Sequence, residues 1–143
     1  MLDRLLTTTN DRVAGVFRVL LGVIFLMTGF MKLLVPRLSE AWSGQLLTAS
    51  IPLYAVSRWS VPFVEVALGI ALLLGVFARG AVAIAIVIMV VATYVHLRVD
   101  DPSLFPLQPS EPVIPLLVML LSFYVLWRGA GAWSLDLKNQ RSS

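Results

Sequence analysis

The chain has 143 residues, of which 59% are hydrophobic and 13% are charged, and its mean hydropathy is +0.90. Soluble domains carry about 25% charged residues, so this composition predicts an integral membrane protein. Cysteine is absent, which excludes disulfides, thiol redox chemistry and thiolate metal sites within the chain. The net charge of +3 does not indicate nucleic acid, because the basic residues stand singly around the ends of apolar segments.

Four apolar segments are long enough to cross a membrane, which takes about 20 residues. They cover residues 13–34, 61–78, 80–97 and 112–128. We therefore predict an all-α membrane protein with one domain over residues 1–143, folded as an antiparallel bundle of four transmembrane helices. The first apolar run is too long for a cleavable signal peptide.

The first predicted helix carries two charged residues, Arg18 and Lys32, inside its apolar run. Steps of four and three residues place them on one face with two glycines and a phenylalanine: Arg18, Gly22, Phe25, Gly29 and Lys32. A charge at the centre of a membrane helix costs about 2.5–3.5 kcal/mol, so this stripe is expected to face other helices. For Arg18 alone we favour a simpler role, in which its side chain extends to lipid phosphates and anchors the helix.

The ends of this helix have clear signals. Asn10 or Asp11 is expected to cap its start, and Pro36 is expected to end it near Val35. The connection that follows is too apolar for a solvated loop, so it predicts a short interfacial helix capped by Ser39. This segment is expected to seal the bundle, with a substrate gate as the alternative.

The second helix is expected to have Pro62 in its first turn, where proline is tolerated, and Glu65 about one turn inside. Gly69 permits close approach of a neighbouring helix. Arg79 and Gly80 are expected to form a tight turn into the third helix, which would then run antiparallel to the second.

The segments on either side of the fourth predicted helix indicate a loop before it and a helix end after it. Residues 101–112 contain four prolines and predict an extended cap, whereas the run Gly129–Gly131 is expected to end the fourth helix before Trp133 and a short polar tail.

With four crossings, seven basic residues lie on the side of the termini and four on the other. This bias predicts that both termini are cytoplasmic, in the inner membrane.

Four ionisable residues are expected to meet at one depth, because neighbouring helices alternate in direction. They are Lys32, Glu65, His96 and Glu111. One interpretation is an outer-side pocket that binds a small polar or quinone-like ligand, where Lys32 neutralises negative charge and Glu65 and His96 act as catalytic proton exchangers. The alternative is structural: Lys32 and Glu65 form a buried ion pair, and His96 and Glu111 extend to water.

A metal site is a weaker interpretation of the same residues. One histidine and two carboxylates can bind a divalent ion, but the positive charge of Lys32 opposes it, so no metal is predicted. Two-histidine haem ligation within the chain is excluded, since His96 is the only histidine.

The sequence resembles the DoxX family of small four-helix membrane proteins. The resemblance lies in RVLLGVIFLMTGFMKLLVP at 18–36, VEVALGIALLLGVFAR at 64–79, the His96 region, Glu111 and GAGAWSLD at 129–136. It implies quinone-linked redox work in the cytoplasmic membrane, since relatives include a subunit of an archaeal thiosulfate:quinone oxidoreductase and proteins of complexes that handle oxidative or thiol stress. The absence of cysteine argues against a thiol mechanism here.

Two functions from different classes follow. The first is a component of a quinone-linked or other membrane oxidoreductase; the second is a non-enzymatic scaffold or assembly factor for such an enzyme. The expected partners are the lipid membrane and, as candidates, an oxidoreductase subunit or a second copy of the chain; no nucleic acid is expected. Transport is less attractive, because four helices leave little room for alternating access.

Overall fold

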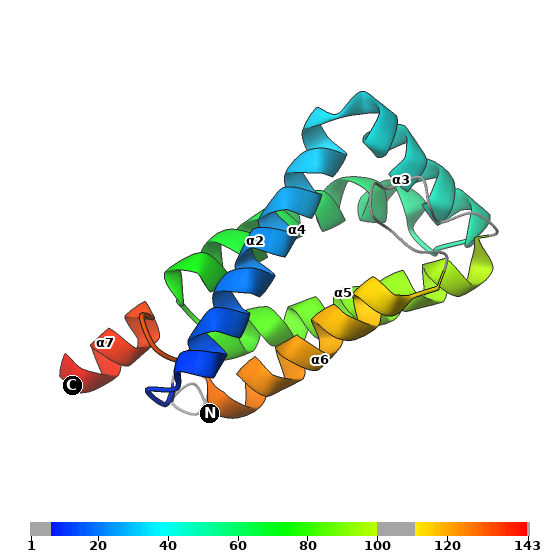
Figure 1. Cartoon of the computed structure of the whole chain (residues 1–143). Coiled ribbons are helices and arrows are strands. Elements are labelled where there is room, and N and C mark those ends of the chain that lie inside the picture. Colours follow the sequence, from blue (N-terminus) through cyan, green and yellow to red (C-terminus); the bar gives the residue numbers. More distant parts are fainter. Residues whose placement is uncertain (1–6, 100–110, 143) are drawn as a thin grey trace.

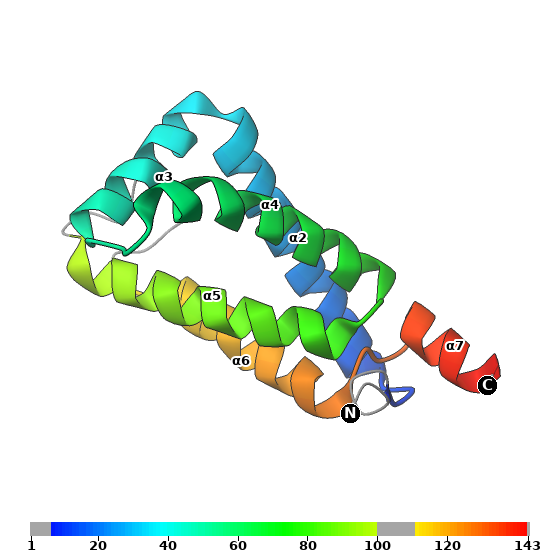
Figure 2. The same cartoon turned by 180° about the vertical axis from the view of Figure 1, so that it is seen from behind.

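The computed structural model describes residues 7–99 and 111–142, and within these ranges all regular structure is helical (Figures 1 and 2). The described helices are α2 (Arg12–Leu34), α3 (Pro36–Thr48), α4 (Tyr54–Leu74), α5 (Ala78–Arg98), α6 (Val113–Arg128) and α7 (Leu135–Ser142). Helices α2, α4 and α5 are long and apolar enough to cross a membrane, and α6 is a shorter apolar helix of 16 residues.

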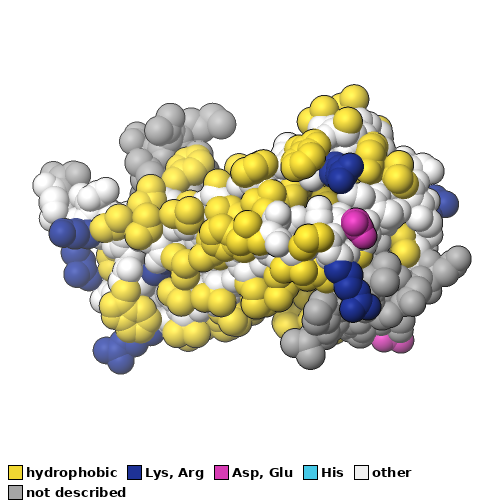
Figure 3. Space-filling view, turned by 90° about the horizontal axis from the view of Figure 1, so that it is seen from above, with side chains coloured by type: hydrophobic (Ala, Val, Ile, Leu, Met, Phe, Trp, Pro, Cys, Tyr) yellow, Lys and Arg dark blue, Asp and Glu magenta, His cyan; other side chains and the backbone are white. Residues whose placement is uncertain are grey.

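The apolar helices pack as two pairs, α2 with α4 and α5 with α6. The pairs lie close together at the end that holds the starts of α2 and α5, here called the terminal end, and diverge toward α3 (Figure 1). Helix α3 crosses the wide end, between the end of α2 and the start of α4 (Figure 2). On the face seen in Figure 3, hydrophobic side chains cover the middle of the molecule and charged ones lie toward its two ends, as expected for a protein in a bilayer.

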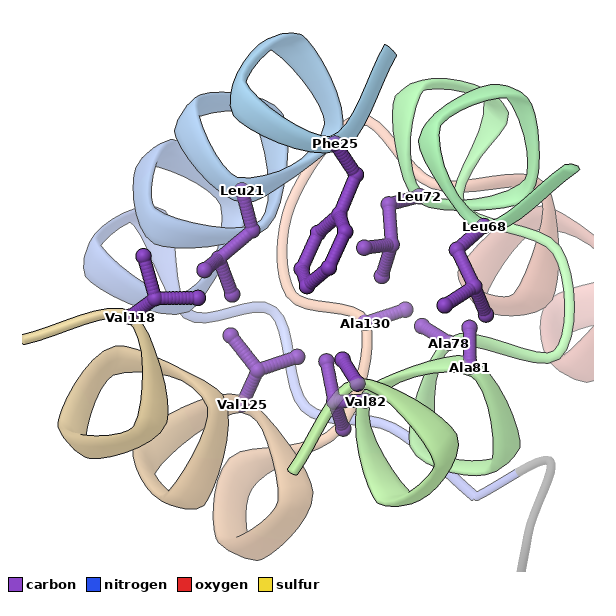
Figure 4. Packing of buried hydrophobic residues seen from close by; sticks show 11 residues of the cluster. Leu21, Phe25, Leu68, Leu72, Ala78, Ala81, Val82, Val118, Val125 and Ala130 are labelled. Atoms are coloured by element: carbon purple, nitrogen blue, oxygen red, sulfur yellow. The ribbon is translucent and has the colours of Figure 1, made fainter. Parts of the chain in front are cut away.

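The hydrophobic core lies where the two pairs meet. Leu21 and Phe25 of α2 point toward Leu72 of α4, Val82 of α5 and Val125 of α6 (Figure 4). Each of these side chains is at most 1% exposed. This cluster therefore holds the two helix pairs together toward the terminal end.

Glycines bring α2 and α4 into backbone contact. A Cβ atom built at Gly69 would lie 2.7 Å from the backbone nitrogen of Leu26, and one at Gly29 would lie 2.9 Å from the carbonyl oxygen of Pro62. Because backbone atoms cannot swing away, the two helices would have to separate to admit even a methyl group. The predicted role of Gly69 in close approach is confirmed.

We expect Gly69→Ala to destabilise the protein by about 1–3 kcal/mol, through overpacking of the α2–α4 contact. Gly44→Ala in α3 is the matched control, since a Cβ there meets nothing within 4 Å and removal of a helical glycine stabilises by up to about 1 kcal/mol. Unfolding of both variants in mixed micelles with increasing SDS measures the difference. Equal midpoints for the two variants would contradict the close contact.

Several predicted boundaries are confirmed. Helix α2 begins one residue before the predicted start and ends at Leu34, and the Asp11 carboxylate caps it by accepting hydrogen bonds from Val13 and Ala14. Partial burial of Asp11 raises the pKa of its carboxyl group. The hydrogen bonds from these two amides and from Arg128 and Tyr124 lower the pKa by more, so it lies below the usual value. Helix α6 also matches its predicted range to within one residue.

The predicted start of the second helix is wrong. Helix α4 begins at Tyr54, so Pro62 lies inside the helix and not in its first turn. A proline that follows polar residues is typical of a helix start, but Ser57, Arg58 and Pro62 all lie within α4. The predicted helix after Pro36 exists, but it begins at Pro36 itself, and Ser39 is inside it.

The turn between α4 and α5 also differs from the prediction. Helix α4 ends at Leu74, and α5 starts at Ala78. Gly75 caps the end of α4, and its φ of 66° is the left-handed conformation that glycine adopts readily. Arg79 and Gly80 therefore belong to the first turn of α5. The cause is a long-range contact: Asp136 accepts hydrogen bonds from the amides of Phe77 and Ala78, at 2.9 and 3.0 Å, and so caps α5 from the C-terminal segment.

The C-terminal segment is more ordered than a polar tail. Gly129, at a φ of 89°, ends α6 as predicted, but the residues after Trp133 form the short helix α7. The predicted extended cap at 101–112 lies almost wholly outside the described residues, which resume at Glu111.

Candidate functional site

A cavity of about 860 Å³ lies at the wide end, between the two helix pairs and against α3. Its wall is mostly apolar and includes residues of α2 to α6, among them Phe25 and Val118 at the edge of the core. Polar or charged side chains also line it, among them Thr28, Lys32, Gln45, Ser57, Glu65 and His96. The cavity is thus an apolar space with a few polar groups on its wall, which is the usual composition of a small-molecule site.

Lys32 and Glu65 form a buried ion pair on this wall. The ammonium nitrogen of Lys32 donates to both carboxylate oxygens of Glu65, at 2.6 and 2.7 Å. The side chain of Glu65 is 2% exposed and that of Lys32 is 10% exposed. The Lys32 nitrogen also lies 4.5 Å from the centre of the Trp42 ring. Close contact of α2 and α4 at Gly29 brings the two charged residues within reach of each other.

His96 lies on the α5 side of the same cavity and is buried. Its Nδ1 is 3.0 Å from the carbonyl oxygen of Ala92, one turn earlier. Because a carbonyl oxygen only accepts hydrogen bonds, Nδ1 is the donor in this contact. The imidazole is thereby oriented by its own helix.

The structure brings three of the four predicted site residues to the cavity, and Glu111 is the exception. Glu111 precedes the first residue of α6 and is exposed, and it does not line the cavity. Its position at the start of the fourth apolar segment predicts the same membrane depth as that of Lys32, Glu65 and His96. Membrane depth alone, however, does not determine the direction of a side chain. Within residues 7–99 and 111–142, no three His, Asp or Glu side chains cluster as metal ligands.

Sequence reasoning missed the contribution of α3 to this site. Trp42, Gln45 and Leu46 line the cavity, and Leu46 is only 1% exposed. A cation–π contact between Trp42 and Lys32 links α3 to the ion pair. The available signal was the row of apolar and amide side chains in the segment after Pro36, which was assigned to the membrane interface.

The prediction that Arg18 anchors the helix to lipid phosphates is wrong. Arg18 is fully buried at the terminal end, and its guanidinium donates to five backbone carbonyl groups, those of Leu72, Leu73, Ala130, Ala132 and Trp133. Its Nε lies 2.7 Å from the carbonyl oxygen of Ala130, and one Nη lies 2.9 Å from that of Leu73. Arg18 therefore ties the end of α4 to the segment that follows α6.

These features define a multi-pass membrane protein in which apolar helices enclose a cavity with buried charges. A model of the DoxX family matches residues 14–98, more than half of the chain, and the chain belongs to this family. The matched range includes Arg18, Lys32, Glu65 and His96 but not Glu111. No curated protein and no solved structure matches the chain.

Proposed function

We propose that this protein is a membrane oxidoreductase component that binds a small, largely apolar ligand with a polar head group, a quinone being the candidate, in the cavity between the helix pairs. The observation that carries the proposal is the 860 Å³ apolar space with the Lys32–Glu65 pair and His96 on its wall. Ligand sites have volumes of about 300–1,000 Å³ and a small number of polar groups that orient the ligand. The chain acts as one domain with α2, α4, α5 and α6 as transmembrane helices, in the inner membrane with cytoplasmic termini.

The three polar residues have distinct roles in this proposal. Lys32 donates a hydrogen bond to a head-group oxygen and stabilises negative charge that develops there. Glu65 and His96 exchange protons with the ligand. Reduction of a quinone to a quinol takes two electrons and two protons; the protons pass through Glu65 and His96, and a partner oxidoreductase supplies the electrons, because the chain has no cysteine for a thiol couple.

A second candidate function is a non-enzymatic scaffold for such an oxidoreductase. The closed geometry of the Lys32–Glu65 pair favours it, because both charges are satisfied by each other and fix the register of α2 against α4. The two functions differ in one respect: only the first requires the cavity to be occupied.

Filling the cavity tests the proposed function. Val61 lines the cavity on α4, whereas Ile70 on the same helix is 47% exposed and does not line it. We expect Val61→Trp to weaken binding of a short-chain ubiquinone analogue by roughly tenfold or more, because overpacking costs about 1–3 kcal/mol. Ile70→Trp is the matched control and should bind like the wild type. Titration of purified protein in nanodiscs, followed by tryptophan quenching or calorimetry, measures both.

Absence of quinone binding by the wild type, or equal binding by the two tryptophan variants, would overturn the proposal. Co-purification of an oxidoreductase with Val61→Trp at wild-type yield and activity would then support the scaffold function.

A further inference from the structure

A second hollow, of about 810 Å³, lies at the terminal end, apart from the cavity of the proposed function. It is formed by the start of α2, the segment after Gly131 and α7, which lie side by side in both cartoon views (Figures 1 and 2). Three of the described residues that line it are cations, namely Arg12, Lys138 and Arg141. We call it the cationic hollow.

The charge of the cationic hollow is not neutralised by the described part of the chain. Arg12, Lys138 and Arg141 are exposed, and neither salt bridge among the described residues involves them. The described carboxylates at this end have other contacts: Asp11 pairs with Arg128 at 2.8 Å, and Asp136 caps α5. The described side chains at the terminal end on the face in Figure 3 include Lys and Arg without a visible acidic neighbour.

The cationic hollow is held in shape by buried contacts. Arg18 donates to the carbonyl groups of Ala132 and Trp133, at 3.3 and 3.2 Å, and Asp136 ties the start of α7 to α5. The amide of Thr8 donates to the side-chain oxygen of Gln140 at 2.9 Å. These contacts fix α7, a polar helix of eight residues, beside the start of α2. Lys138 and Arg141 are thus held near Arg12 before a ligand binds, so binding has little entropic cost for ordering them.

An apolar edge accompanies the positive charge. Trp133 lines the cationic hollow and is 69% exposed, and Leu135 beside it is 40% exposed. Trp133 has a φ of 57°, an unusual conformation for a bulky residue, which persists because its backbone is held on both sides. An exposed tryptophan at the end of membrane helices is typical of the zone of lipid head groups.

We propose that the cationic hollow binds an anionic phospholipid, with its phosphate among Arg12, Lys138 and Arg141 and its upper acyl chain against Trp133 and Leu135. A lipid is favoured over a soluble phosphate because the hollow lies where helices long enough to span the bilayer begin, and because charge and apolar surface occur side by side. The site is independent of the cavity at the wide end.

Lipid retention by the intact protein tests this proposal. Arg12→Gln/Lys138→Gln/Arg141→Gln removes the three cations, and Arg37→Gln/Arg58→Gln/Arg98→Gln makes the same change in net charge at the other end. Each cation near an anionic lipid contributes about fivefold to binding, so the first variant should lose roughly 100-fold in affinity for phosphatidylglycerol, and the second should stay near the wild type. Native mass spectrometry, with phosphatidylcholine as the neutral probe, measures retention.

Equal loss in both triple variants, or equal retention of the two lipids by the wild type, would overturn the site. Displacement of phosphatidylglycerol by millimolar inorganic phosphate would overturn the choice of a lipid. If the first variant does not fold, brominated lipids give a second measurement without charge changes. The contribution of Trp133 to tryptophan quenching is the part that disappears in Trp133→Phe. This contribution should be larger with brominated phosphatidylglycerol than with brominated phosphatidylcholine, and equal contributions would contradict the proposal.

Discussion

Arg18→Met is expected to destabilise the protein by about 3–5 kcal/mol. Methionine resembles the aliphatic part of the arginine side chain but has no hydrogen-bond donor. The substitution therefore removes the donors to five backbone carbonyl groups where the end of α4 meets the segment after α6. The carbonyl group of Leu72 would keep its hydrogen bond from the Gly75 amide, at 3.2 Å. The other four would lose the one from Arg18, at about 1–3 kcal/mol for each that finds no other donor. Unfolding in SDS mixed micelles, followed by circular dichroism, measures the loss.

Two further variants make this result interpretable. Arg58→Met removes a cation whose guanidinium lies 5.4 Å from the centre of the Trp59 ring, and should cost less than about 1 kcal/mol. Arg18→Lys keeps the charge but offers three donors on one atom, so its stability should fall between wild type and Arg18→Met. If Arg18→Met and Arg58→Met unfold at the same SDS fraction, the carbonyl contacts do not hold the terminal end.

The sequence predicted which segments are helical better than where one of them begins and ends. Helices α2 and α6 match because local signals define their ends: the carboxylate of Asp11, Pro36 after α2, and Gly129. The end of α4 and the start of α5 do not match, because the cap that starts α5 comes from Asp136, some 60 residues later in the chain. A contact of that range leaves no periodic trace in the segment that it shapes.

The sequence predicted part of the site, because helical spacing shows which residues share a face but not which distant residues they contact. The shared stripe of Arg18 and Lys32 on one face of α2 was predicted from helical spacing, and both side chains are turned toward other helices. Spacing could not show what each meets: Lys32 meets a carboxylate at the cavity, and Arg18 meets backbone carbonyl groups, which are the same in every sequence. Glu111 was misplaced because an exposed residue just before a helix follows the path of the chain rather than a helical face.

Lys32→Met alone is expected to destabilise the protein by about 3–5 kcal/mol, and Lys32→Met/Glu65→Leu is expected to recover most of that loss. The single change leaves a carboxylate, 2% exposed, without its partner in a largely apolar wall. The double change replaces both charges by apolar side chains of similar size, which is often neutral or stabilising for a buried pair. A double-mutant cycle of SDS unfolding with Glu65→Leu as the fourth corner measures the coupling.

The same double variant separates the two candidate functions, because it restores the fold without restoring the polar groups of the cavity wall. If the pair serves ligand binding, Lys32→Met/Glu65→Leu should be stable and yet bind the ubiquinone analogue at least about tenfold more weakly than the wild type, since a charged hydrogen bond contributes about 1.5–3 kcal/mol. If the pair only fixes the register of α2 and α4, binding and stability should recover together. A stable variant with unchanged binding would remove Lys32 and Glu65 from the ligand site and leave His96 as the polar group to test next.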